Sequence, residues 1–145
     1  MKKKLERSGA QTLVDALAKA GTEVLFGYPG GQVLDIFNCL PEAPFQFILA
    51  RNEQGCAHMA DGYARATGRP GVCLVTSGPG ATNLVTGIAD AMIDSTPLVC
   101  ITAQVAAAAL GSDAFQEADI ISMTMPVTKW NFQITRAEEI PGAIA

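Results

Sequence analysis

The sequence is poor in charged side chains and has no long apolar run. Charged residues make up 17% of the 145 positions, which is few for a small soluble domain. No apolar stretch is long enough for a signal peptide or a membrane span, so we expect a cytoplasmic protein with no membrane partner. The net charge is −4, and the basic start Met1–Lys4 is soon interrupted by Glu6. The balance of charge therefore predicts no nucleic-acid partner.

Histidine and paired cysteines are also scarce. His58 is the only histidine, which excludes a multi-histidine metal site. A Ser-His-Asp triad using His58 would lack the G-x-S-x-G nucleophile elbow. The four cysteines are far apart and contain no C-x-x-C pair, so buried, reduced thiols are expected rather than disulfides or zinc ligands. We predict no metal site in this chain.

What the sequence does contain is an alternation of helical and strand-like segments. Apolar periodicity predicts strands at 23–26, 45–50, 71–75 and 98–102, and helices at 9–20, 33–40, 53–67 and 84–92. The short connections favour an α/β fold of three layers, with a mostly parallel sheet covered by helices on both faces. We expect a single domain spanning residues 1–145. Because apolar residues reach 49%, either the sheet is doubly covered or part of the surface meets a partner.

The C-terminal part is harder to interpret. The segment Val127–Phe132 contains Trp130 and is predicted to be a strand that packs on the sheet. Thr135–Glu138 has capping-box spacing and predicts the start of a helix that the chain leaves at Ala145. We therefore expect the chain to be a fragment of something longer.

Glu53 is the first candidate for chemistry, because it lies where the strand at 45–50 ends and a helix begins. Ligands collect outside the carboxyl ends of parallel strands, and a carboxylate there can exchange protons with a bound heterocycle. The alternative is that Glu53 only stabilises the first turn of its helix through the dipole. Glycine-rich turns follow three of the strands, at Gly27–Gly31, Gln54–Gly55 and Gly78–Gly80. Such turns let a backbone approach a ligand, and the Gly78 turn lacks the third glycine of the dinucleotide fingerprint.

Six motifs in order resemble one known family. They are Gly27-Tyr28-Pro29-Gly30-Gly31, Arg51-Asn52-Glu53-Gln54-Gly55, Asp61-Gly62-Tyr63-Ala64-Arg65, Thr76-Ser77-Gly78-Pro79-Gly80-Ala81-Thr82-Asn83, Asp94-Ser95-Thr96-Pro97 and Asp113-Ala114-Phe115-Gln116-Glu117. Together the motifs are similar to the N-terminal, pyrimidine-binding domain of the thiamine-diphosphate enzymes, most closely the acetohydroxyacid (acetolactate) synthases. The resemblance covers nearly the whole chain. It also implies that the domain's final strand lies beyond Ala145.

The resemblance implies roles for particular residues. The glutamate matching Glu53 hydrogen-bonds N1′ of the cofactor's aminopyrimidine and so activates the cofactor. The implied catalytic residues are Glu53, Gly31, Phe115 and Gln116, and the implied cofactor-binding residues are Pro29, Gly30, Gly31, Glu53, Thr76, Pro79 and Asn83. The diphosphate and Mg²⁺ would be held by a C-terminal domain that this chain lacks. The resemblance leaves open whether FAD is bound.

The implied reaction is decarboxylation of pyruvate and addition of the bound fragment to a second 2-oxo acid, in branched-chain amino acid biosynthesis. The implied assembly is a homodimer or higher homo-oligomer, with a regulatory subunit left open, and the isolated chain is expected to be inactive. The alternatives are a pyruvate oxidase or 2-oxo acid decarboxylase of the same family, or a non-catalytic pyrimidine-domain module. Asn52 stands where family members usually have His, and Ala103 where they have Gly. The Ala106–Ala109 run also departs from the family pattern, which leaves contacts near that loop open.

Overall fold

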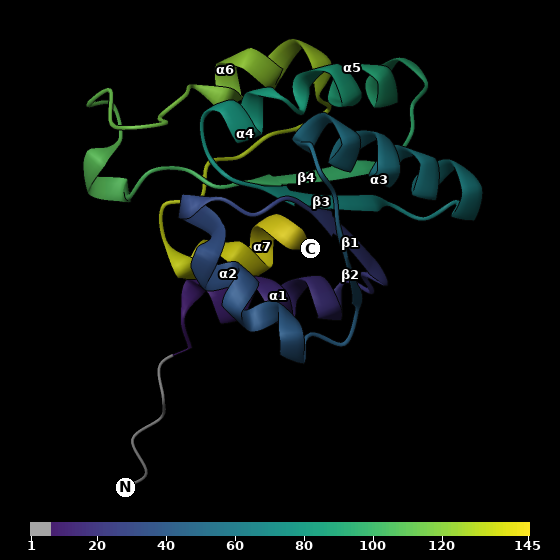
Figure 1. Ribbon diagram of the computed structural model, residues 1–145, viewed down its shortest axis with the longest axis horizontal. Coiled ribbons are helices and arrows are strands. Elements are labelled where there is room, and N and C mark those ends of the chain that lie inside the picture. The colour runs from purple at the N-terminus through teal and green to yellow at the C-terminus, as the bar shows by residue number, and fades with distance from the viewer. Residues whose placement is uncertain (1–6) are drawn as a thin grey trace, which may run out of the picture.

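The computed structural model describes residues 7–145 (Figure 1), so the basic start and the first residues of the predicted domain lie outside the described residues. The chain forms the helices α1 Gly9–Lys19, α2 Leu34–Cys39, α3 Glu53–Thr67, α4 Pro79–Thr82, α5 Val85–Ile93, α6 Ile120–Thr124 and α7 Ile140–Ile144. The strands are β1 Val24–Gly27, β2 Gln46–Leu49, β3 Gly71–Val75 and β4 Leu98–Thr102. Short 3-10 helices are η1 Gly31–Val33, η2 Leu40–Glu42, η3 Ala107–Ala109, η4 Met125–Val127 and η5 Ala137–Glu139.

The four strands form one parallel sheet in the order β2-β1-β3-β4. Helices α1, α2 and α7 cover one face of the sheet, and α3, α5 and α6 cover the other (Figure 1). Along β1, Leu25 packs into the core on the α1 side and Phe26 into the core on the α3 side, as the period of two in a strand requires. The predicted three-layer α/β fold is therefore confirmed.

Helix α3 lies unusually close to the sheet and to α5. A Cβ atom added at Gly71 would lie 2.0 Å from the carbonyl oxygen of Ala60, and one added at Gly87 would lie 2.4 Å from the Cβ of Ala57. The two glycines therefore allow a contact that no larger side chain would permit. This contact matters because α3 begins at Glu53.

The predicted boundaries of the first and third helices agree with the structure, since Ser8 and Asn52 each accept a hydrogen bond from the backbone as N-caps. Gly68 ends α3 with a positive φ of 72°, the expected left-handed cap. The helix predicted at 33–40 is shorter and flanked by the 3-10 turns η1 and η2. The helix predicted at 84–92 is preceded by a separate short helix, α4.

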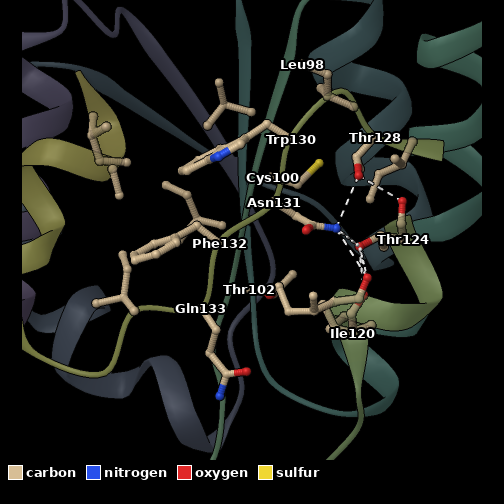
Figure 2. A pocket seen from close by; sticks show the side chains of 18 of the residues that line it. Leu98, Cys100, Thr102, Ile120, Thr124, Thr128, Trp130, Asn131, Phe132 and Gln133 are labelled. Carbon is tan, nitrogen blue, oxygen red and sulfur yellow. Dashed lines mark hydrogen bonds between the residues drawn. The ribbon is translucent and has the colours of Figure 1, made fainter. Parts of the chain in front are cut away.

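The strand predicted around Trp130 is wrong. Residues 128–136, between η4 and η5, are irregular, because the side chain of Asn131 anchors this segment to α6 rather than to the sheet. Its Nδ2 donates to the carbonyl oxygen of Ile121 at 3.2 Å and to Thr124 Oγ1 at 3.3 Å (Figure 2). Trp130 is 63% exposed and stacks on Phe132 with ring centroids 5.7 Å apart.

A groove of about 1000 Å³ lies along the outer edge of β4, lined on its far side by residues 127–134 (Figure 2). Within residues 7–145, β4 pairs only with β3. The final strand expected from the family resemblance has no counterpart in the described part of the chain and stays a prediction.

The capping box predicted at Thr135–Glu138 is shifted by one residue. Glu139, rather than Glu138, accepts from the backbone N–H groups of Thr135 and Arg136, at 2.9 and 3.2 Å. The turn that it caps is η5, which leads into α7. No helix in the described part of the chain is both long and apolar enough to cross a membrane.

We predict that Asp61, on α3, stabilises the fold in a pH-dependent way. Its buried carboxylate accepts from Arg65 Nε at 2.7 Å, and Arg65 Nη2 also reaches Asp94 Oδ2 at 2.7 Å, just beyond α5. The hydrogen bond from Arg65 lowers the pKa of Asp61, so its contribution to stability is present at neutral pH and lost as the pH falls through that lowered pKa. Asp61→Ala should lower the free energy of unfolding at pH 7 by about 1–3 kcal/mol, measured by urea denaturation.

The matched control is Asp94→Ala, which removes a half-exposed partner of the same arginine. It should lower the free energy of unfolding by less than Asp61→Ala does. Equal losses for the two variants, or a loss for Asp61→Ala that is as large at pH 2 as at pH 7, would contradict the prediction.

Candidate functional site

The carboxyl ends of β1 and β3 mark the point where the strand order reverses. From β1 the chain moves to β2 on one side, and then crosses to β3 on the other side. Ligands of open parallel sheets bind in the crevice at such a point. The backbone N–H of Tyr28 donates to the carbonyl oxygen of Leu74 at 3.2 Å, so the pairing of β1 with β3 continues into the Pro29–Gly31 turn.

Thr76 fills the space between the two glycine-rich turns. It is 7% exposed, and its Oγ1 accepts from the backbone N–H of Gln32 at 3.3 Å. A Cβ atom at Gly30 would lie 2.5 Å from Thr76 Cβ, and one at Gly80 would lie 2.7 Å from Thr76 Cγ2. The turn after β1 and the turn after β3 therefore meet on one threonine side chain.

Glu53 faces the same place from the first turn of α3. Asn83 Nδ2 donates to Glu53 Oε2 at 3.0 Å, and a Cβ added at Gly80 would lie 3.5 Å from Glu53 Oε1. The carboxylate is half-buried and lies at the ligand edge of the sheet. Burial and the nearby Glu53 carboxylate raise the pKa of Cys56 to about 12, so the neighbouring thiol is neutral.

The structure thus brings together most of the residues predicted for the cofactor site. Pro29 lies in the turn beside Thr76, and Pro79 opens α4, the short helix that leads to Asn83. Gly31 starts η1, and a Cβ atom there would meet nothing within 4 Å. The backbone at Gly31 is therefore open, whereas the backbone at its neighbour Gly30 is packed against Thr76.

The loop after β4 approaches the site through its backbone. The carbonyl oxygen of Gln116 lies 2.5 Å from the position of a Cβ at Gly78, so Gln116 rests directly on the turn after β3. Phe115, its neighbour, is 84% exposed. Of the two loop residues predicted to be catalytic, the structure brings the main chain of Gln116 to the site and leaves the ring of Phe115 at the surface.

Sequence reasoning missed two contributors. Gly80 was not among the predicted site residues, although it separates Thr76 from Glu53, and Gln32 ties the first turn to Thr76. The glycine spacing after β3 was a usable signal for Gly80. A backbone N–H leaves no signal in a sequence, so Gln32 could not have been found. In residues 7–145 no group of three or more His, Cys, Asp or Glu side chains could hold a metal ion.

Two neighbouring glycines give a test of this packing. Gly30 has an extended backbone with φ −170°, so alanine fits its conformation but collides with Thr76. Gly30→Ala should lower the free energy of unfolding by about 1–3 kcal/mol, whereas Gly31→Ala should change it by less than about 0.5 kcal/mol. Urea denaturation of the two variants side by side measures both values, and equal effects would show that the Thr76 contact does not hold the turns together.

Comparison with known proteins supports the interpretation of these motifs. The family model described as the thiamine pyrophosphate enzyme, N-terminal TPP binding domain, matches residues 7–123. The chain is 53% identical over 133 residues to the probable acetolactate synthase large subunit of Methanocaldococcus jannaschii, covering 92% of this chain and 22% of that protein.

Two further relatives give the same picture. Identity is 53% over 139 residues to the acetolactate synthase large subunit of Corynebacterium glutamicum, covering 95% of this chain and 22% of the relative. It is 49% over 138 residues to the acetolactate synthase isozyme 2 large subunit of Escherichia coli, covering 95% and 25%. The chain thus spans between a fifth and a quarter of the length of these relatives.

Proposed function

Because the chain belongs to the thiamine pyrophosphate enzyme family, through that family's N-terminal cofactor-binding domain, we propose that it forms the pyrimidine-binding half of the active site of an acetolactate synthase. The observation that supports this most directly is the position of Glu53. Its carboxylate lies at the switch-point edge of the sheet, oriented by Asn83 and next to two glycine-rich turns.

The residues at this edge fit an aminopyrimidine ring. Gly31 leaves open space for a planar group to approach the backbone. Thr76 lies between the turn that holds Gly30 and the turn that holds Gly80, and Glu53 would present its carboxylate to a ring nitrogen. When bound, thiamine diphosphate supplies an electron sink for breaking the bond to the substrate carboxylate.

Glu53 is the residue that would act on the cofactor. Asn83 occupies Oε2, and no hydrogen bond from the described residues reaches Oε1. Oε1 would therefore be the oxygen that shares a proton with the aminopyrimidine, while the hydrogen bond from Asn83 orients the carboxylate. Such positioned proton transfer contributes about 10²–10⁴-fold to a rate.

The substrates and partners belong to the same proposal. The donor would be pyruvate and the acceptor a second 2-oxo acid, with the Gln116 loop on the substrate side. The relatives are named large subunits, which supports pairing with a smaller regulatory subunit. Mg²⁺ and the diphosphate would be bound outside these residues, in a cytoplasmic homodimer or higher homo-oligomer whose second subunit covers this edge.

Glu53→Gln in the full-length protein tests the catalytic role. Exchange of the C2 proton of bound thiamine diphosphate, followed by NMR, should slow by about 10²–10⁴-fold because an amide cannot hold the proton at N1′. Stability to urea should stay close to that of the parent protein, since the shape is preserved.

The matched control is Glu42→Gln, which changes an exposed glutamate at the end of η2 and should leave the exchange rate unchanged. An undiminished C2 exchange rate in Glu53→Gln would remove the proposed role of this carboxylate.

Product analysis of the full-length protein tests the reaction itself. Incubation with pyruvate, thiamine diphosphate and Mg²⁺ should release carbon dioxide and acetolactate in equal amounts. Acetaldehyde as the main product would indicate a decarboxylase, and acetate or acetyl phosphate an oxidase. Either result would replace the synthase assignment while leaving the role of Glu53 intact.

A further inference from the structure

The loop between β4 and α6 is held in shape by a carboxylate that has no role in the proposed reaction. Glu117 Oε1 accepts from the backbone N–H of Gly111 at 2.5 Å, and Oε2 accepts from that of Ala114 at 3.0 Å. The backbone N–H of Glu117 in turn donates to the carbonyl oxygen of Ala114 at 2.8 Å. One side chain thus closes residues 111–117 into a compact turn.

The backbone of this turn adopts conformations that it would not hold unaided. Asp113 and Gln116 have φ values of 55° and 60°, in the left-handed region that residues other than glycine rarely enter. Such conformations persist only when surrounding contacts enforce them. The hydrogen bonds from Gly111 and Ala114 to Glu117 enforce the conformation in this way, because the two donors lie on either side of Asp113.

A second side chain closes the base of the same loop. Gln104 Nε2 donates to the carbonyl oxygen of Ala118 at 2.9 Å, and its Oε1 accepts from the backbone N–H of Val105 at 2.8 Å. The hydrogen bonds of Gln104 therefore hold the first residues of the loop next to Ala118, at its end. At the tip of the loop, the backbone of Gln116 rests on Gly78.

From this arrangement, and resting on the proposed function, we propose that Glu117 is a positioning residue that sets where Gln116 and Phe115 meet the second 2-oxo acid. It acts through the main chain of residues 111–116 and touches neither cofactor nor substrate. Its removal should therefore weaken substrate recognition and leave cofactor activation by Glu53 unaffected.

The charge of Glu117 is central to this role. The backbone N–H groups of Gly111 and Ala114, followed by those of Ser112 and Asp113, lower the pKa of Glu117. The carboxylate form is thus favoured in the folded loop, and protection of the loop amides should be present at neutral pH and lost as the pH falls through that lowered pKa. Asp113 is the other carboxylate in the turn, and Gln104 at the base carries no charge.

Glu117→Gln in the full-length protein is the decisive variant, with Glu42→Gln as the matched control. Hydrogen exchange of the 111–116 amides, followed by mass spectrometry, should accelerate about tenfold, the change expected from losing one hydrogen bond of ordinary strength. KM for the second 2-oxo acid should rise by a similar factor of about ten, while C2 proton exchange of bound thiamine diphosphate keeps its parent rate.

Each outcome decides between explanations. Unchanged amide exchange, or faster exchange with an unchanged KM, would overturn the proposal. Loss of C2 exchange in the variant would also overturn it, because the loop would then act on the cofactor. A parent protein that shows no C2 exchange would instead refute the proposed function, and amide exchange would still report on the loop. If Glu117→Gln does not fold, protection of the same amides in the parent protein at successively lower pH supplies the test.

Discussion

The parallel pairing of β1 with both β2 and β3 is the constraint on which the site depends. It places the first strand in the middle of the sheet, so that the chain must reverse its direction of travel across the sheet between β2 and β3. The turns after β1 and β3 are brought side by side as a result, and both close on Thr76. A different strand order would separate these turns and leave Glu53 without the Gly80 turn beside it.

The close packing of α3 then determines the direction of Glu53. A helix that begins directly after an adjacent strand can only present its first turn at the ligand edge if it lies close to the sheet. Gly71 and Gly87 remove the side chains that would push it away, and the ion pair of Arg65 with Asp94 joins its C-terminal part to the end of α5. Residues distant from the site thus set the geometry in which Asn83 can reach the carboxylate.

The sequence predicted the sheet, its helices and the cluster around Glu53 because those features arise from local patterns. Apolar periodicity defined the strands, while Asn52 and Gly68 marked the ends of α3. The strand expected around Trp130 was wrong because its β-favouring composition was outweighed by Asn131, whose partners lie on α6. The contacts of Glu117 and the approach of Gln116 to Gly78 depend on how one loop folds back, which no spacing in the sequence records.

The contact between Gln116 and Gly78 links the two halves of the proposed site. Gly78 has φ 56° and ψ −118°, a conformation open to glycine and strained for other residues, and its missing side chain is also what leaves room for the carbonyl of Gln116. A single residue therefore shapes the turn beside the proposed cofactor edge and receives the loop that we propose lies on the substrate side. The loop that carries Gln116 therefore meets the Gly78 turn through backbone atoms, whereas the Glu53 carboxylate is oriented by a separate contact, the hydrogen bond from the side chain of Asn83.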